Sequence, residues 1–530
     1  MVFGRAKVQK TAIALLGSLL LAASGVLPLN AAKRLEVQLD GMVIPVLIEE
    51  LLDWGSAGGT SRSELTTWLN LLDAESQLDL LELLQAPLLT QQSMARQMLR
   101  SWAGRQLLDE FSDLLRVGDD SSGIVVLNTL ESLLNNQAEV STLDLLKALP
   151  AESIRLDLDA LLRVASRWRS QLQQQQQLAK TLGRLSATSV PAPKELTHEQ
   201  AHGAAPELIS LSVPHRSEPL PLEVWPPSVG TPLRSSLVVL MPGLGGSKDH
   251  FRWLAQSLGS KGWPVVVLEH PGSDARAVQD LLTGRRLPPG AEVLPERLAD
   301  LQAVLRAHKE GKFASSSQRL VLMGHSLGAL TALLAAGDIP EPGLHLRCRK
   351  ALEDIPLTNL SWLLQCQLTD VQIPVQPLVP QLEAIVALNS FGSLLWPSYG
   401  DLDIPVPVLL AGGTLDLITP PLSEQLDLLL ATQPHPASRA VLVEGASHFS
   451  PVRVEAQKVE GPSDDLFKLG KELVGLQPLT VQRLLAVEIQ IFLEQVEAGE
   501  GLKDSVHKQI GDLRLHRLDR AAVERLRDAQ

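Results

Sequence analysis

Three residues in the second half of this sequence have the types and the chain order that nucleophilic acyl chemistry requires. Ser326 lies in GHSLG, between Gly324 and Gly328, and Asp416 in GGTLD and His448 in GASHF follow it. A serine hydroxyl is a poor nucleophile unless a base takes its proton and an acid orients that base. We therefore interpret Ser326 as the candidate nucleophile, His448 as its base and Asp416 as the orienting acid. The two glycines leave room for a tight strand-to-helix turn around the serine.

The loop PGLGGS at residues 242–247 is the candidate oxyanion loop. Negative charge that develops on an attacked carbonyl oxygen needs preorganised donors, and backbone amides serve where side chains stay out of the way. We expect one donor to be the amide of Leu244. The second should be the amide of Leu327, directly after Ser326, at the positive end of the following helix. A plain glycine turn is the alternative interpretation of this loop.

The elements that must position these residues are short apolar runs, each ending in small or polar residues. They are SSLVVLMPGLGG, GWPVVVLEHPGS, QRLVLMGHSLG, AIVALNSFG, VPVLLAGGTLD and RAVLVEGASH. Runs that are apolar throughout are typical of parallel strands covered on both faces, and helical stretches lie between them. Residues 207–500 therefore predict an α/β fold with a doubly wound, mostly parallel sheet, preceded by an antiparallel hairpin in ELISLSV and LPLEVWP. Chemistry in such sheets gathers at the carboxyl ends of the strands, where the three candidate residues lie.

The regions on either side of this sheet have a different pattern. Residues 33–185 are Leu-rich at helical spacing and predict a small all-α domain, in which Ser141 caps a helix three residues before Asp144. A helical bundle without chemistry is one interpretation of this domain, and a lipid-binding or lid function is the other. Residues 186–206 are rich in Pro, Ala, Gly and polar residues and predict a linker. Residues 501–530 have balanced charge and helical spacing and predict a charged helical tail.

An insertion at residues 338–383 separates the helix after Ser326 from the next strand and contains the only two cysteines, Cys348 and Cys366. We interpret it as a cap over the active-site end of the sheet, with a simple surface excursion as the alternative. In an exported protein the two cysteines are candidates for a disulfide bond, whereas in a cytosolic protein they would be buried thiols.

The first 32 residues resemble a secretory signal peptide. Arg5, Lys7 and Lys10 precede an uncharged stretch with an apolar centre, and small residues near Gly25 or Ala31 offer cleavage sites. The protein is therefore expected to be exported to the periplasm or the extracellular space. The alternative is a membrane anchor formed by residues 11–32, because that stretch is long enough to span a bilayer.

Charge narrows the choice of partners. The chain carries a net charge of −13, and residues 35–150 contain 18 acidic and 6 basic side chains, a local net of −12. Nucleic acid and anionic lipid are therefore poor partners for that region, and membrane contact is expected only through an uncleaved N-terminal segment or a lipid substrate. The predicted chemistry needs no cofactor and no metal.

One alternative from another class is a zinc protease. His198, Glu199 and His202 match H-E-x-x-H, but the flanking PAPKE and GAAP favour an accidental turn in a hinge, because zinc binding needs this motif inside a stable helix. A non-catalytic binding protein on a hydrolase scaffold is another alternative. Such proteins have normally lost a catalytic residue, and here none is missing.

Residues 207 to about 500 resemble the α/β-hydrolase superfamily. PGLGGS, VVVLEHPGSDA and GHSLGAL together resemble its branch of platelet-activating-factor acetylhydrolases and dienelactone hydrolases. The N-terminal region resembles a domain of unknown function attached to such hydrolases in oxygenic photosynthetic bacteria. The resemblance implies a metal-independent serine esterase for short acyl esters, lipid esters among them, with a thioesterase or amidase as alternatives on the same triad.

Two features depart from that branch. Its acetylhydrolases take the acid from the strand end where this sequence has Asn389, and its dienelactone hydrolases use cysteine where this sequence has Ser326. Both departures weaken any transfer of substrate identity.

Overall fold

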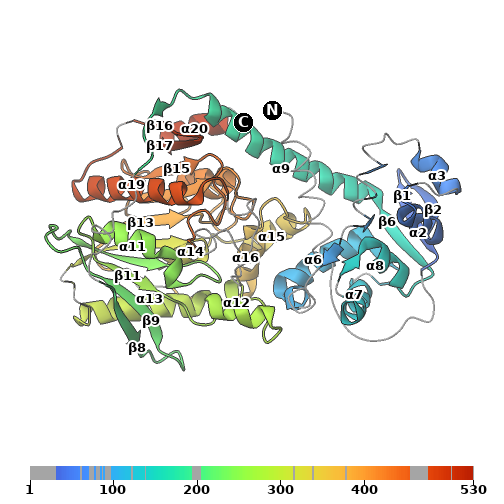
Figure 1. Cartoon of the computed structure of the whole chain (residues 1–530), viewed down its shortest axis with the longest axis horizontal. Coiled ribbons are helices and arrows are strands. Elements are labelled where there is room, and N and C mark those ends of the chain that lie inside the picture. The colour runs from blue at the N-terminus through green and yellow to red at the C-terminus, as the bar shows by residue number, and fades with distance from the viewer. Residues whose placement is uncertain are drawn as a thin grey trace. The chain divides into compact units, whose positions relative to one another are not determined.

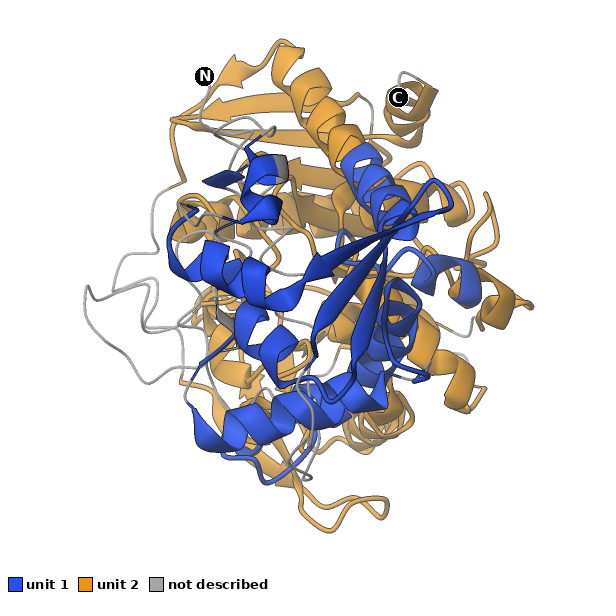
Figure 2. Ribbon diagram, turned by 90° about the vertical axis from the view of Figure 1, so that its right-hand side faces the viewer, with its two compact units in different colours: residues 1–171, 280–288, 349–358 blue, residues 172–279, 289–348, 359–530 orange. Residues whose placement is uncertain are grey.

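The computed structural model describes residues 32–528 apart from a set of gaps. The gaps lie at 60–62, 71–76, 79–80, 82–83, 86, 90–96, 121–122, 138, 194–204, 314, 316, 337–338, 376–378, 454–474 and 503. The chain divides into two compact units (Figure 2). Unit 1 comprises residues 1–171, 280–288 and 349–358, and unit 2 comprises 172–279, 289–348 and 359–530.

Unit 1 contains two small β-sheets as well as helices, so the prediction of an all-α N-terminal domain is wrong. Its main sheet has the strand order β2-β1-β6-β4, and β3 and β5 form a second pair. The strands are β1 Arg34–Leu39, β2 Met42–Leu47, β3 Pro87–Leu89, β4 Leu115–Val117, β5 Val140–Ser141 and β6 Ser153–Asp157.

The error has a local physical cause in the first hairpin. Leu35, Val37 and Leu39 alternate with polar residues, a period-two pattern that favours a strand. Asp40 and Gly41, both with positive φ, then make the two-residue turn that joins β1 to β2. The Leu-rich helical periodicity begins only after this hairpin.

The helices of the N-terminal region pack around these strands through a core of leucines, valines and Trp54. They are α2 Ile48–Ser56, α3 Glu64–Leu69, α6 Trp102–Leu114, α7 Ile124–Asn136 and α8 Thr142–Ala148. Helix α9 Leu158–Arg184 follows them; it ends in unit 2, and its Leu178 and Leu182 belong to a core cluster of that unit. The predicted cap at Ser141 is confirmed. Its hydroxyl accepts a hydrogen bond from the Asp144 amide, and the Asp144 carboxylate accepts one from the Ser141 amide.

Unit 2 is built on an 11-stranded sheet with the order β7-β16-β17-β15-β14-β13-β12-β10-β11-β9-β8. Its six central strands are parallel, as predicted: β10 Ser236–Met241, β11 Val265–Leu268, β12 Arg319–His325, β13 Leu382–Leu388, β14 Val408–Gly413 and β15 Arg439–Val443. The predicted leading hairpin is also present, with β8 Glu207–Leu211 antiparallel to β9 Leu220–Trp225.

Helices cover both faces of this sheet (Figure 1), which explains why its strands are apolar throughout. In β10, Leu237, Val239 and Met241 belong to one core cluster, whereas Val238 and Leu240 belong to the other. The first cluster includes residues of α13 Leu294–Lys309 and α14 Leu327–Ala335, and the second includes residues of α11 Arg252–Gly259 and α19 Pro478–Glu497. The sheet and its helices are consistent with an α/β-hydrolase fold.

The C-terminal tail departs from the prediction of a charged helix. Residues 506–518 form the hairpin of β16 Val506–Ile510 and β17 Leu513–Leu518, and only then does α20 Arg520–Asp528 begin. Strand β17 pairs antiparallel with β15 and so extends the main sheet. Leu513 and Leu515 alternate with Arg514 and His516, a strand pattern that helical spacing obscured.

The expected linker at 186–206 is partly structured. Within it, β7 Thr188–Ser189 pairs with β16 at the edge of the main sheet. Among the helices that the structure describes, none is both long enough and apolar enough to cross a membrane.

Candidate active site

Ser326 lies at a sharp turn between β12 and α14, as its glycine context predicts. Its backbone has φ 53° and ψ −120°, a conformation that side-chain-bearing residues rarely adopt. The turn requires close approach of two backbones. A Cβ atom at Gly324 would lie 2.2 Å from the carbonyl carbon of Gly328, and one at Gly328 would lie 2.1 Å from the Met241 oxygen. The two glycines therefore allow a turn that presents the serine at the carboxyl end of the central strand.

Asp416 is fully buried in the loop after β14 and accepts hydrogen bonds through both carboxylate oxygens. Oδ1 accepts from the amides of Ile418 and Thr419 at 2.9 and 2.8 Å. Oδ2 accepts from the Thr419 hydroxyl at 2.6 Å and from the Asn389 side-chain amide at 2.8 Å. The side chain is therefore held in one orientation from two sides.

His448 lies in the loop after β15, with Nδ1 3.0 Å from Oδ2 of Asp416. The two loops pack directly, because a Cβ atom at Gly413 would lie 2.1 Å from the Ala446 carbonyl oxygen. Burial alone would raise the pKa of Asp416, but the neighbouring His448 and the hydrogen bonds from Thr419 lower it below its ordinary value of 3.8. The carboxylate is therefore ionised at neutral pH and can hold a proton on Nδ1, which leaves Nε2 available as a base.

His325 connects the serine turn to the His448 loop. Its Nε2 donates to the His448 carbonyl oxygen at 2.9 Å, and the two imidazole rings have centroids 4.9 Å apart. Burial and then His448 lower the pKa of His325 to about 3, so its ring is neutral at pH 7. This hydrogen bond holds the His448 backbone against the residue that directly precedes Ser326.

Among the hydrogen bonds of the described residues, none joins the Ser326 hydroxyl to His448. In serine hydrolases without substrate this bond is often long, and it tightens in the substrate complex. The structure thus brings the three predicted residues to neighbouring loops and joins Asp416 to His448 directly.

The oxyanion loop lies against Ser326. A Cβ atom at Gly243 would lie 3.0 Å from the Ser326 Cβ, a tight contact that the glycine avoids. Among the described hydrogen bonds, the amides of Leu244 and Leu327 donate to no protein acceptor. Leu327 is the first residue of α14 and fully buried, and buried amides without an acceptor are rare in folded proteins. Both predicted donors are therefore available to an incoming oxyanion.

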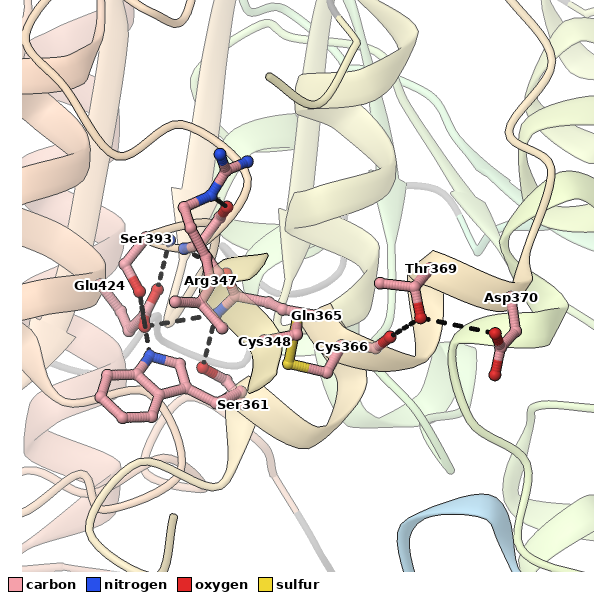
Figure 3. The surroundings of a disulfide bond; sticks show 11 residues. Arg347, Cys348, Ser361, Gln365, Cys366, Thr369, Asp370, Ser393 and Glu424 are labelled. Atoms are coloured by element: carbon pink, nitrogen blue, oxygen red, sulfur yellow. Dashed lines mark hydrogen bonds between the residues drawn. A yellow bond between two sulfur atoms is a disulfide. The ribbon is translucent and has the colours of Figure 1, made fainter. Parts of the chain in front are cut away.

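The predicted cysteine pair forms a disulfide bond in the insertion at 338–383, with Cα atoms 5.3 Å apart (Figure 3). The insertion contains α15 Leu344–Leu352 and α16 Ser361–Gln367. The amide of Ser361, at the start of α16, donates to the Ile418 carbonyl oxygen at 2.9 Å, in the loop that carries Asp416. The insertion therefore contacts the carboxyl end of the sheet.

A buried carboxylate, Glu424, joins this insertion to the loop after β13. It accepts from the Asn359 side-chain amide at 2.6 Å and from the amides of Gly392 and Ser393 at 2.8 and 3.1 Å. The Ser393 hydroxyl adds a further bond at 2.5 Å (Figure 3). Sequence analysis assigned no role to Glu424 or Asn359, because no sequence pattern indicates a hydrogen bond between residues 65 positions apart.

Asn389 and Thr419 are the other contributors that sequence analysis did not assign. Asn389 occupies the strand end where acetylhydrolases of the resembled branch carry their acid, and here it donates to Asp416 instead. Thr419 has a recognisable signal, because an aspartate that accepts from residues two and three positions later is a common turn motif. D-L-I-T at 416–419 has that pattern.

The alternative zinc site cannot be placed. His198, Glu199 and His202 lie outside the described residues, as do residues 1–31 of the expected signal peptide. In the part of the chain that the structure describes, no three His, Cys, Asp or Glu side chains form a group that could hold a metal ion.

Two family comparisons match separate parts of the chain. Residues 238–459 match the model described as an alpha/beta hydrolase family, and residues 31–157 match one described as an alpha/beta hydrolase of unknown function (DUF1400). No curated protein matches the sequence. The comparisons do not address the narrower resemblance to acetylhydrolases and dienelactone hydrolases.

Proposed function

We propose that this chain, of which residues 31–157 and 238–459 match models of alpha/beta hydrolases, hydrolyses carboxylic esters through Ser326, His448 and Asp416. The observation that carries the proposal is the Asp416–His448 hydrogen bond beside a serine in a strained left-handed turn. Strained serine turns of this kind serve acyl transfer in hydrolases of this fold.

The proposed reaction has two steps. His448 Nε2 takes the proton of Ser326 Oγ as that oxygen bonds to the ester carbonyl carbon, and the amides of Leu244 and Leu327 hold the resulting oxyanion. The carbonyl re-forms as the alcohol oxygen leaves with the proton from His448. A water molecule then attacks the acyl-enzyme by the same route and releases the acid and free Ser326.

Export and the cap are part of the same proposal. A disulfide bond forms and persists in oxidising compartments, which supports secretion by the N-terminal segment. The insertion at 338–383, held by the disulfide and by Glu424, would shape the acyl pocket above Ser326. We propose short-acyl esters, lipid esters included, as the substrate class.

Replacing the nucleophile tests this function. Ser326→Ala should lower kcat on p-nitrophenyl acetate and butyrate by at least about 10⁴-fold and abolish labelling by a fluorophosphonate probe, because no other group can form the acyl-enzyme. Ser260→Ala, in a turn after α11 away from the carboxyl ends, should behave as wild type. Full ester hydrolysis or full labelling in Ser326→Ala would show that the mechanism is wrong.

The same assay separates the reaction classes. Among matched p-nitrophenyl esters, thioesters and anilides, the esters should be turned over fastest. Turnover of the thioester or anilide with no turnover of the ester would replace the ester assignment by one of the two alternatives on the same triad.

A further inference from the structure

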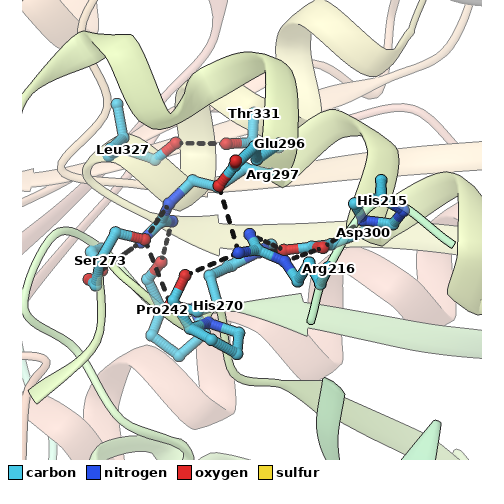
Figure 4. A network of polar contacts seen from close by, with 12 residues as sticks. His215, Arg216, Pro242, His270, Ser273, Glu296, Arg297, Asp300, Leu327 and Thr331 are labelled. Carbon is cyan, nitrogen blue, oxygen red and sulfur yellow. Dashed lines mark hydrogen bonds and ion pairs between the residues drawn. The ribbon is translucent and has the colours of Figure 1, made fainter. Parts of the chain in front are cut away.

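A buried arginine lies directly behind the oxyanion loop. Arg297, on α13, is 1% exposed and extends its guanidinium toward Pro242 and Ser273 (Figure 4). We propose that Arg297, supported by Ser273, is a positioning residue that fixes the direction of the Leu244 amide. The inference rests on the proposed function, in which that amide binds the oxyanion.

The guanidinium uses three of its nitrogens on this loop and its neighbour. Nη1 donates to the Pro242 carbonyl oxygen at 2.8 Å and Nη2 to the Gly243 carbonyl oxygen at 2.9 Å. Nε donates to the Ser273 hydroxyl at 2.9 Å. Ser273 closes the arrangement, because its carbonyl oxygen accepts from the Gly245 amide at 2.8 Å. The loop is therefore held on both sides of Leu244.

The bond to Gly243 determines where the Leu244 amide points. The Gly243 carbonyl and the Leu244 N–H belong to one planar peptide group, and the described chain has no cis peptide bonds. In a trans peptide the C=O and N–H bonds point in opposite directions. A guanidinium that holds the oxygen therefore fixes the direction of the N–H on the opposite side of the peptide, in a loop whose Gly243 would place a Cβ atom 3.0 Å from the Ser326 Cβ.

The arginine stays charged although it is buried. Burial lowers the pKa of Arg297 to about 9, so the guanidinium is still protonated at neutral pH, with Asp300 on the same helix opposing the shift. Asp300 itself is ionised and accepts from Arg216 Nε and Nη2 at 2.6 and 2.7 Å and contacts His270 Nδ1 at 2.8 Å (Figure 4). The positive charge beside the Gly243 oxygen also favours electron withdrawal from that peptide, which strengthens its N–H as a donor.

Lysine is the informative substitution at this position. It keeps the charge but cannot hold the Pro242 and Gly243 oxygens and the Ser273 hydroxyl together, because only guanidinium has a planar fork of donors. Arg297→Lys should lower kcat on p-nitrophenyl butyrate by about 10- to 100-fold and leave KM within about threefold, since an oxyanion donor acts in the transition state. The Ser326 hydroxyl adds to the carbonyl carbon of a trifluoromethyl ketone and forms a tetrahedral adduct that carries an oxyanion. The affinity of Arg297→Lys for this inhibitor should fall by a similar factor.

Arg439→Lys is the matched control. Arg439 is also fully buried and donates to a backbone carbonyl, that of Ala437, but it lies at the start of β15, away from the strand ends that carry the site. It should lose thermal stability as Arg297→Lys does and keep wild-type kcat and inhibitor affinity. Equal kcat and equal inhibitor affinity in Arg297→Lys and Arg439→Lys would overturn the positioning role.

Ser273→Ala provides a second variant that removes no charge, for the case that Arg297→Lys does not fold. It removes the acceptor of Arg297 Nε, together with the hydrogen bond that the Ser273 hydroxyl donates to the His270 carbonyl oxygen at 3.3 Å. Both kcat and inhibitor affinity should fall by about 3- to 10-fold with KM unchanged. Unchanged values in a folded Ser273→Ala would count against the proposal. If the wild type itself showed neither ester turnover nor probe labelling, the proposed function would be overturned, and the positioning role with it.

Discussion

Asp416 accepts hydrogen bonds from Ile418, Thr419 and Asn389 besides its contact with His448. Transferring an ionised carboxylate into a protein interior is costly unless its oxygens are paired. Here the hydrogen bonds also hold the carboxylate in one orientation, with Oδ2 toward the imidazole of His448. At the scale of single residues, the site is therefore preorganised around the acid.

Asp416→Asn tests this arrangement. The amide can present its NH₂ group toward Nδ1 and so favour the wrong imidazole tautomer, and kcat should fall on the order of 10⁴-fold by analogy with other triads, with KM little changed. Ester hydrolysis followed from pH 5 to 9 is the measurement. Asp401→Asn, in an exposed turn where Asp401 accepts from the Ser398 amide, is the control. A loss of less than about tenfold in Asp416→Asn would mean that the acid is another residue.

At the scale of elements, the strand-to-helix turn depends on how closely β12, α14 and β10 approach. The Gly328 backbone lies against the Met241 and Pro242 carbonyls at the end of β10, where the oxyanion loop begins. The approach of Gly328 to these carbonyls therefore positions both Ser326 and the start of the loop that should hold the oxyanion.

Gly328→Ala should be strongly destabilising, because its Cβ would lie 2.1 Å from a main-chain oxygen that cannot move without disturbing the sheet. We expect a loss of about 3 kcal/mol or more in the free energy of unfolding, measured with urea, together with loss of ester hydrolysis. Gly183→Ala is the control. The nearest atom to its Cβ would be at 3.7 Å, and the site lies within α9, where alanine should be neutral or stabilise by up to about 1 kcal/mol. Equal stability of the two variants would contradict the close approach at Gly328.

At the scale of the whole molecule, buried histidines connect stability to pH. The folded pKa of His325 is about 3, below its ordinary value of 6.5, so the unfolded chain binds a proton between these values and the folded chain does not. The stability contributed by a neutral His325 is thus present above pH 6.5 and lost as pH falls toward 3.

His325→Gln should remove this dependence and keep a side-chain donor for the His448 carbonyl oxygen. The free energy of unfolding of wild type minus that of His325→Gln should fall by about 1.4 kcal/mol for each pH unit below 6.5. Urea unfolding at pH 7, 6, 5 and 4.5 gives this difference. Asp427, whose pKa burial raises to about 6, acts in the opposite direction but equally in both proteins. A difference that did not change with pH would mean that His325 is protonated in the folded state.

The division of the molecule was only partly predictable. Unit 1 takes residues 280–288 and 349–358 from the region expected to form the hydrolase domain. Within unit 1, Trp168 Nε1 donates to the carbonyl oxygens of Asp354 and Ile355, both at 2.8 Å. Residues 349–358 lie between the two cysteines, and no pattern in the sequence indicates that they group with α9.

Sequence patterns alone were sufficient to predict the parallel strands of the sheet and the serine turn, and to name Asp416 and His448 as candidates for acid and base. These features depend on local spacing, since apolar runs of strand length and the glycines around Ser326 are read within a few residues. Local patterns led to a wrong prediction at residues 34–47 and 506–518, where short strands in Leu- or charge-rich surroundings were taken for helices. Three contacts are visible only in the tertiary structure: Asn389 donates to Asp416, Glu424 joins the insertion at 338–383 to the loop after β13, and Arg297 holds the Gly243 oxygen. Each of these contacts joins residues 27 to 65 positions apart, and such pairs meet only when the strands and helices between them have packed.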